Sequence, residues 1–296
     1  MIEVSDLQKS YGTLKAVAGV SFSVAQGETF GLLGPNGAGK TTSIHMLTGA
    51  LRPDAGTIQI NGQADPTRAE VRQSIGLAPQ ALALYDTLTA DENLTFFGRL
   101  YGLNGTTLRQ RVEHALGLAG LVDRRADRVG TYSGGMKRRL NLACALVHDP
   151  PVVFLDEPTV GVDPQSRNYL FDTIEALAKQ GRTILYTTHY MEEAQRLCDR
   201  VAIMDTGKIL ALDTVDGLIA NHGGRAIVDV ELERVPENAA TLPGPLEGNR
   251  LRFESAQPQE EAWRLTQAGL RFTSFHIEAP NLEKVFLNLT GRRLRD

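Results

Sequence analysis

A glycine-rich loop near the amino terminus constrains this chain more than any other feature. Residues 34–42 read GPNGAGKTT, in which Gly34 and Gly39 are separated by four residues and are followed by Lys40 and Thr41. Glycines let the backbone curl so that successive N–H groups point at a polyphosphate. Lys40 adds positive charge at the β- and γ-phosphates, and the Thr41 hydroxyl is a ligand suited to Mg²⁺. We therefore predict a phosphate-binding loop made of the residues Gly34, Pro35, Asn36, Gly37, Ala38, Gly39, Lys40, Thr41 and Thr42.

The segments on either side of this loop fit the same interpretation. ETFGLL, at 28–33, has the apolar content of a buried strand, and SIHMLTGA, at 43–50, is expected to be a helix. A helix that starts at the loop directs the positive end of its dipole at the bound anion. The loop predicts nucleotide binding. Phosphate-binding loops occur in kinases, GTPases, helicases, motors and transporters, so the purpose of the nucleotide needs other evidence.

Strands and helices alternate through most of the chain. Short apolar runs in 2–32 predict a small sheet leading into the loop, residues 85–147 have helical periodicity, and residues 206–207 are expected to turn a hairpin. The runs PVVFLDEPT at 151–159 and RTILYTTH at 182–189 are typical of buried parallel strands. The sequence therefore predicts an α/β core with a mostly parallel sheet around the phosphate-binding loop.

The pattern changes in the last quarter of the chain, which predicts a second domain. Runs with strand character (AIVDVELE, NRLRFES and RFTSFHIEA) alternate with helical runs (PQEEAWRLTQAG and PNLEKVFLNLTG), and the last helix is expected to begin at Pro280. The segment 234–249 is expected to be a loop. We predict one domain over residues 1–219, with a helical subdomain at about 85–150, and a small α+β accessory domain over 220–296.

Bulk composition limits the classes of function. Of the 296 residues, 42% are hydrophobic and 22% are charged, as in an ordinary globular protein, and the formal net charge of −4 argues against non-specific nucleic-acid binding. The amino terminus does not have the pattern of a signal peptide, and no apolar run is long enough for a transmembrane helix, so we expect a cytoplasmic chain. Cys144 and Cys198 form no CxxC pair and are expected to be buried free thiols.

A second glycine motif, YSGGM at 132–136, precedes a strongly helical run. A serine at a helix N-cap with two glycines beside it leaves backbone N–H groups open, which makes a second anion site. Taken alone, Ser-Gly-Gly is more often a turn and a cap. Its place, about one helix upstream of VVFLDEPT in a helical insertion after the phosphate-binding loop, gives more weight to the anion site.

In this order the motifs resemble those of the ATP-binding-cassette (ABC) ATPases. GPNGAGKTT is similar to their Walker A loop, LAPQ with Gln80 to their Q-loop, and YSGGM to their signature. VVFLDEPT is similar to their Walker B strand with the glutamate that follows it, VGVDP with Asp163 to their D-loop, and TTH with His189 to their switch histidine. Tyr11, in KSYG, stands where that family stacks an aromatic ring on adenine. Met136 departs from the glutamine usual in the signature, which puts the packing of that loop in doubt but not its phosphate-facing serine and glycines.

The resemblance implies a fold and a set of roles. The fold is a P-loop NTPase (RecA-like) core with an antiparallel β subdomain and a helical signature subdomain. Mg²⁺ would be bound by Thr41 and Asp156, with Gln80 at the metal or the water. Glu157 is the candidate to orient or deprotonate the attacking water, and His189 is the candidate contact to the γ-phosphate. Besides the phosphate-binding loop, the residues expected to bind ATP are Tyr11, Ser133, Gly134, Gly135 and Asp163.

The same resemblance implies partners. The serine–glycine motif of one subunit would close over the ATP held by a second, so we expect a head-to-tail dimer of two copies or of this chain with a paralogous cassette. A buried triphosphate needs hydrogen-bond donors on all sides, and one subunit supplies only part of them. We also expect a separate transmembrane permease, a peripheral location at the inner face of the cell membrane, and no nucleic-acid partner.

Three functions compete on the sequence. A kinase would lack the signature motif and the glutamate after Walker B, both of which this sequence has. Family members that act on ribosomes or DNA usually have two cassettes in one chain or a coiled-coil insertion, and this sequence shows neither. TVDGLIANHGG and APNLEKVFLNLTGRRLRD resemble the tails of ATPases of the drug-resistance and nodulation-export (ABC-2) type, which pair with six-helix permeases. We therefore expect export of a drug-like compound, a lipid or a polysaccharide, with a soluble ABC-family ATPase as the alternative.

Overall fold

The computed structural model describes residues 2–236 and 242–291. The chain divides into two compact units between Val215 and Asp216, near the predicted boundary at 219, and the assignment of two domains stays a prediction. Part of the loop predicted at 234–249 lies outside the described residues, and the prediction is wrong at its end, where Leu246–Glu247 pair with a neighbouring strand. Among the described residues, no helix is both long enough and apolar enough to cross a membrane.

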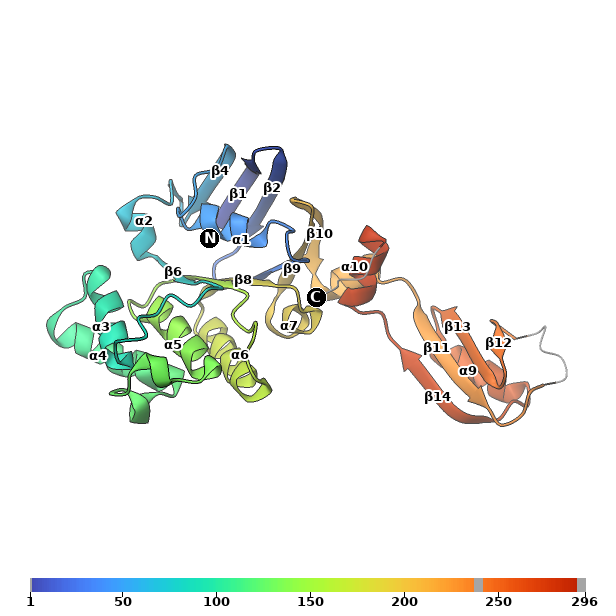
Figure 1. Cartoon of the computed structure of the whole chain (residues 1–296). Helices are drawn as coiled ribbons and strands as arrows, with labels where there is room; N and C mark the ends of the chain where they lie inside the picture. The colour runs from blue at the N-terminus through green and yellow to red at the C-terminus, as the bar shows by residue number, and fades with distance from the viewer. Residues whose placement is uncertain (1, 237–241, 292–296) are drawn as a thin grey trace. The chain divides into compact units, whose positions relative to one another are not determined.

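A six-stranded sheet forms the centre of the first unit (Figure 1). In spatial order its strands are β10 (Lys208–Thr214), β9 (Arg200–Asp205), β3 (Thr29–Leu33), β8 (Thr183–Thr188), β7 (Val152–Asp156) and β6 (Ile75–Ala78). All neighbours pair in parallel except β10 with β9, which form the predicted hairpin. Every residue of β3, β7 and β8 is buried, which is why these strands are continuous apolar runs in the sequence.

An antiparallel sheet packs over one face of the central sheet, together with α1 (Lys40–Leu47). In spatial order its strands are β2 (Leu14–Val24), β1 (Ile2–Tyr11), β4 (Ala55–Ile60) and β5 (Gln63–Ala64). Val4, Ile44 and Phe154 belong to one buried cluster that includes both sheets and α1. The prediction of one small sheet over 2–32 is therefore wrong. β1 and β2 alternate between buried and exposed residues, whereas β3 is buried throughout and belongs to the central sheet.

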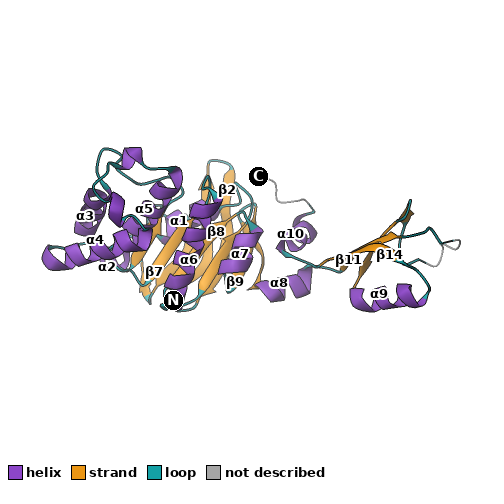
Figure 2. Ribbon diagram, turned by 90° about the horizontal axis from the view of Figure 1, so that it is seen from below, coloured by secondary structure: helices purple, strands orange, loops and turns teal. Residues whose placement is uncertain are grey.

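Helices cover the opposite face of the central sheet (Figures 1 and 2). They are α5 (Gly134–Leu146), α6 (Pro164–Lys179) and α7 (Met191–Leu197). The shorter α2 (Ala69–Gln73), which precedes β6, packs through Val71 in the cluster on the side of α1. With α3 (Ala90–Leu100) and α4 (Gly105–Ala119), α5 forms the predicted helical segment, whose own core includes Leu94, Leu116 and Leu140. Met136 packs against this core, which explains an apolar side chain after the two glycines.

The second unit has its own antiparallel sheet, in the order β12-β13-β11-β14. Its elements are α8 (Val215–His222), β11 (Ala226–Leu232), β12 (Leu246–Glu247), β13 (Arg250–Ser255), α9 (Pro258–Gln267), β14 (Phe272–Glu278) and α10 (Leu282–Thr290). Leu265 of α9 packs in a cluster with Val230 and Phe253 of the sheet. The prediction that the last helix begins at Pro280 is wrong, because the Asn281 side chain accepts a first-turn N–H at 3.0 Å and caps the helix.

The two cysteines are core residues. Cys144 and Cys198 are free and buried. Burial raises the pKa of both thiols well above the usual range, so they stay protonated and unreactive at neutral pH.

Candidate nucleotide-binding site

The phosphate-binding loop connects the end of β3 to the start of α1. Gly39 is the N-cap of α1 with a φ of 104°, and a Cβ added there would lie 2.4 Å from the carbonyl oxygen of Ala16. A Cβ added at Gly34 would lie 2.2 Å from the carbonyl oxygen of Met204. Close approach of the neighbouring backbone therefore requires both glycines. The N–H groups of the first turn of α1 have no partner within the helix, so they are suited to bind an anion.

A cavity of about 560 Å³ opens beside this loop. Gln80 and Glu157 line one part of it, and Tyr11 and Leu14, both exposed, line it from β1 and β2. Of the predicted loop, Asn36, Gly37, Gly39, Lys40, Thr41 and Thr42 line the cavity, whereas Gly34, Pro35 and Ala38 do not. Large apolar side chains beside a polar loop provide a surface on which a base ring can stack. The size and the lining of the cavity fit a nucleotide.

The Lys40 ammonium group binds partners within the chain. Its Nζ donates to the carbonyl oxygens of Gly34 at 2.7 Å and Pro35 at 3.1 Å, and lies 2.9 Å from Oε1 of Glu157. The Lys40 and Glu157 side chains are each only 4% exposed. Removing one partner of a buried ion pair leaves an uncompensated charge, which is strongly destabilising. Any anion that binds Lys40 therefore competes with Glu157.

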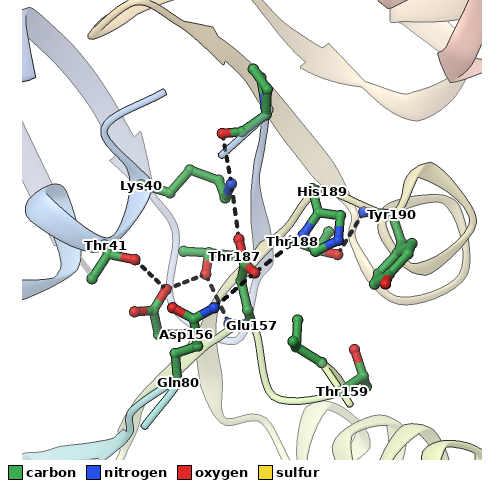
Figure 3. A network of polar contacts seen from close by, with 12 residues as sticks. Lys40, Thr41, Gln80, Asp156, Glu157, Thr159, Thr187, Thr188, His189 and Tyr190 are labelled. Carbon is green, nitrogen blue, oxygen red and sulfur yellow. Dashed lines mark hydrogen bonds and ion pairs between the residues drawn. The ribbon is translucent and has the colours of Figure 1, made fainter. Parts of the chain in front are cut away.

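Two further predicted residues reach the same carboxylate (Figure 3). Nε2 of Gln80 lies 3.3 Å from Oε2 of Glu157, and Nδ1 of His189 lies 3.1 Å from the same oxygen. Gln80 follows β6, Glu157 follows β7 and His189 follows β8, so the carboxyl ends of three strands meet here. The structure thus brings together Lys40, Gln80, Glu157 and His189.

Thr187 of β8, which was not identified from the sequence, hydrogen-bonds to both acidic residues, at the backbone N–H of Glu157 and at the carboxylate of Asp156. Glu157 has a φ of 44°, a left-handed conformation that a residue with a side chain adopts only when its surroundings hold it there. Its N–H donates to Oγ1 of Thr187 at 3.0 Å and to the Thr187 carbonyl oxygen at 3.2 Å. The Thr187 hydroxyl in turn donates to Oδ1 of Asp156 at 2.6 Å. The sequence does not single out Thr187, because the same strand also contains Thr183 and Thr188.

Asp156 and Thr41 form the candidate metal site (Figure 3). Oγ1 of Thr41 lies 3.3 Å from Oδ1 of the buried Asp156. Over the described ranges, no group of three or more His, Cys, Asp and Glu side chains could hold a metal ion. Mg²⁺ does not need such a group, because one or two carboxylates, waters and the phosphates of a substrate commonly bind it. The two oxygen ligands beside the phosphate-binding loop therefore fit Mg²⁺.

A second supporting residue, Glu193 of α7, lies close to the same strand ends. Its carboxylate is buried and accepts three hydrogen bonds from hydroxyl groups. The donors are Thr159 at 2.6 Å, Tyr186 at 2.8 Å and Thr188 at 2.7 Å. Thr159 follows β7 and the other two donors belong to β8. The Glu193 carboxylate therefore links the segment that carries Glu157 to the strand that precedes His189. Nothing in the sequence distinguishes Glu193 from its neighbour Glu192.

The signature residues do not line the cavity within one chain. Ser133 is exposed and caps α5 by accepting a first-turn N–H at 3.2 Å. A Cβ added at Gly135 would lie 2.0 Å from Oγ of Ser166, so packing requires this glycine. A Cβ added at the exposed Gly134 would meet no atom within 4 Å, so nothing in this chain requires glycine there. Asp163 caps α6 through the N–H of Ser166 at 2.9 Å and does not line the cavity either.

Known proteins with similar sequences are ABC transporter ATP-binding proteins. A family model described as ABC transporter matches residues 17–160. The linearmycin resistance ATP-binding protein LnrL of Bacillus subtilis (strain 168) is 41% identical over 313 residues, covering 100% of this chain and 100% of the relative. The Nod factor export ATP-binding protein I of Ralstonia nicotianae is 42% identical over 310 residues, covering 100% of this chain and 95% of the relative.

Solved structures share the fold of about three quarters of the chain. The structure of an ATP-binding subunit of an ABC transporter matches with a TM-score of 0.69 and 32% identity, covering 75% of this chain and 93% of that one. A dimeric bacterial ABC transporter cassette matches with a TM-score of 0.67 and 25% identity, covering 72% of this chain and 98% of that one. These matches confirm the predicted fold class. Because its whole length aligns with a relative at 41% identity, the chain belongs to the ABC ATPase family and is the ATP-binding, ATP-hydrolysing subunit of an ABC transporter.

Proposed function

We propose that Glu157 orients and deprotonates the water that attacks the γ-phosphate of ATP. The observation that carries this assignment is the meeting of Lys40, Gln80 and His189 at the Glu157 carboxylate beside the cavity. Groups that converge on one anion are also placed to converge on a phosphate. Transfer of a phosphoryl group to water depends mainly on positioning and on charge compensation, and this arrangement supplies both.

Binding of the triphosphate exchanges one anion for another at Lys40. The γ-phosphate takes the ammonium group from Glu157, and the N–H groups of the loop bind the β-phosphate. Without its lysine partner, the Glu157 carboxylate is free to accept a proton from water. His189 passes from Glu157 to the γ-phosphate, and Gln80 holds the water in line.

The remaining nucleotide contacts are proposed from the same cavity. Thr41 and Asp156 would hold Mg²⁺, which would supply positive charge to neutralise the phosphates. Thr187 keeps Asp156 and Glu157 at fixed positions through hydrogen bonds to both residues. Tyr11 stacks on the adenine ring, and its exposure beside the cavity supports this role.

We propose that a second cassette, either another copy or a paralogue, completes the site. The 13-residue helix α5 begins at Gly134, so Ser133 and Gly134 present N–H groups and the positive end of a helix dipole at an exposed position. Open space around Gly134 is explained if the close neighbour that requires glycine belongs to another molecule. The dimeric state of the bacterial cassette described above supports pairing of two cassettes, which we propose to be head-to-tail.

We propose that a transmembrane permease docks on an exposed apolar patch made of Tyr85, Phe96 and Leu100. These side chains are 48%, 37% and 65% exposed. Phe96 and Leu100 are one turn apart on α3, and the rings of Tyr85 and Phe96 touch, with centroids 5.0 Å apart. Exposed apolar patches are typical of interaction sites. With a six-helix permease bound there, the chain is held at the inner face of the cell membrane.

Export is the direction that the relatives support. Their names describe one resistance protein and one export protein. We propose export of a drug-like compound, a lipid or a polysaccharide, with the substrate selected by the permease. The alternative, a soluble ABC-family ATPase that acts on ribosomes or DNA, is less favoured because the chain carries one cassette and has a net charge of −4.

Glu157→Gln tests the hydrolytic role. The amide cannot accept a proton, so we expect kcat to fall by a factor on the order of 100 or more while ATP still binds. Phosphate release and nucleotide binding are measured on the same preparation, with the exposed Glu192→Gln as a control of unchanged rate. Wild-type turnover in the Glu157 variant would remove Glu157 from this role.

Thr187→Val tests the support of the two carboxylates. Valine has nearly the same shape but makes neither hydrogen bond, so we expect kcat to fall about 3- to 10-fold with unchanged ATP affinity. Thr183→Val is the matched control, because this buried residue of the same strand accepts the N–H of Gly27 at 2.9 Å, away from the site. Equal losses in both variants would mean that only the strand is weakened.

Ser133→Arg tests the second half of the site. A bulky cation at this helix start blocks docking, so we expect loss of the ATP-dependent dimer and of hydrolysis, with the ATP affinity of the monomer unchanged. Sedimentation with and without ATP in the Glu157→Gln background measures the dimer, and Thr107→Arg, exposed on α4, is the control. If the monomer loses ATP affinity instead, the site is complete within one chain.

Leu100→Asp tests the apolar patch. The residue is exposed, so the fold and the basal ATPase rate should be kept, while a charge in the patch opposes docking of an apolar surface. We expect the variant to lose the membrane protein that co-purifies with the wild-type chain from detergent-solubilised membranes. Trp263→Asp, in the second unit and equally exposed at 65%, should co-purify normally. Retention of the permease by the Leu100 variant would place the interface elsewhere.

A further inference from the structure

The loop that carries Gln80 has no regular structure of its own. Residues 79–88, between β6 and α3, form neither helix nor strand. Buried backbone N–H and C=O groups outside helices and sheets need other partners. In this loop several of those partners are buried polar side chains of α3 and α5.

Two residues of α5 hold the first part of the loop. Nη1 of Arg138 donates to the carbonyl oxygens of Gln80 at 2.6 Å and Pro79 at 3.4 Å. Asn141 donates to the carbonyl oxygen of Pro79 at 3.2 Å and accepts the N–H of Ala83 at 3.1 Å. Arg138 and Asn141 are only 8% and 3% exposed and lie on the same face of α5, three residues apart. The backbone on either side of Gln80 is therefore attached to this helix.

A buried residue of α3 holds the far part of the loop. Asn93 accepts the N–H of Tyr85 at 2.9 Å and donates to the carbonyl oxygens of Tyr85 at 3.1 Å and Thr89 at 2.9 Å. The backbone of the loop is thus bound to the helical segment in both parts, while the side chain of Gln80 reaches Glu157.

Arg138 also binds the segment on the other side of that contact. Its Nη2 donates to the carbonyl oxygen of Val160 at 3.1 Å. The N–H of Val160 in turn donates to the carbonyl oxygen of Glu157 at 3.3 Å. One guanidinium group therefore connects α5, the loop of Gln80 and the segment that follows Glu157.

A cation at this position is costly for the fold. Burial lowers the pKa of the Arg138 guanidinium, and no carboxylate of the described residues forms an ion pair with it. Hydrogen bonds to carbonyl oxygens compensate this charge, and the negative charge of Asp156 favours it from a longer distance. An apolar side chain of similar volume would fill the same space without that desolvation cost. The arrangement therefore favours a role that depends on these particular hydrogen bonds.

We propose that Arg138 is a positioning residue that fixes the loop of Gln80 and the segment after Glu157 to α5, and thereby places Gln80 against Glu157. The proposal rests on the hydrolytic role of Glu157. Because α5 begins beside Ser133, the same guanidinium ties the helix that meets the second cassette to the residue that reaches the catalytic carboxylate.

The first test is Arg138→Met in the full-length chain. Methionine fills the volume but cannot donate, so we expect kcat for ATP hydrolysis to fall about tenfold, the loss of one strong charged hydrogen bond. KM and ATP binding should change less than twofold, because Arg138 does not contact the phosphate-binding loop.

Arg139→Met is the matched control. This next residue of α5 donates to the carbonyl oxygen of Ala119 at 2.7 Å and lies over the ring of Tyr169. We expect it to lower Tm similarly without lowering kcat.

The second test is a double variant with Gln80→Ala. If Arg138 acts through Gln80, kcat of Gln80→Ala/Arg138→Met lies within about twofold of Gln80→Ala alone. The proposal would be overturned if the double variant lost kcat by the product of the two single losses. It would also be overturned if Arg139→Met lost as much kcat as Arg138→Met. If the methionine variant does not fold, Arg138→Lys replaces it in the test. Lysine keeps the charge but cannot donate to both segments, so we expect a lowered kcat. Wild-type kcat in the lysine variant would also overturn the proposal.

These experiments distinguish a failure of the positioning role of Arg138 from a failure of the hydrolytic role of Glu157. Wild-type kcat in Arg138→Met, together with an inactive Glu157→Gln, refutes the positioning role alone. Wild-type kcat in Glu157→Gln refutes the hydrolytic role whatever Arg138→Met does.

Discussion

The buried ion pair between Lys40 and Glu157 is the interaction on which the site depends. Two opposite charges removed from water stabilise each other, and neither can be left alone at low dielectric without a large cost. The pair joins the phosphate-binding loop after β3 to the carboxylate after β7, and Gln80 and His189 reach that same carboxylate. Polar groups are thus arranged around an anion before any nucleotide binds. In the proposed mechanism, a triphosphate that enters the cavity displaces Glu157 and binds to these groups.

The fold makes this arrangement possible because parallel strands bring their carboxyl ends to one edge of a sheet. Neighbouring positions of β8 point to opposite faces, so Thr187 supports Asp156 on one side while Thr188 donates to Glu193 on the other. The left-handed backbone at Glu157 is kept by hydrogen bonds from this same strand. The helical segment adds the last component, because the buried Arg138 attaches the loop of Gln80 to α5.

Much of the fold and of the candidate site could be predicted because the decisive features are local in the sequence. Glycine spacing predicts the phosphate-binding loop, and the resemblance of VVFLDEPT and TTH to short motifs of the ABC ATPases identifies Glu157 and His189. Thr187 and Arg138 could not be identified in this way, because their partners come from distant segments. The Arg138 bond to Gln80, for example, spans 58 positions. Strand order was equally hidden, since local alternation does not say which sheet β1 and β3 join.

The most direct test of the central claim is a crystal structure of the chain with Mg²⁺ and a non-hydrolysable ATP analogue. We expect Nζ of Lys40 to contact the β- and γ-phosphate oxygens and the Glu157 carboxylate to have left its 2.9 Å contact with Nζ. A structure with the nucleotide in the cavity and that ion pair intact would contradict this expectation.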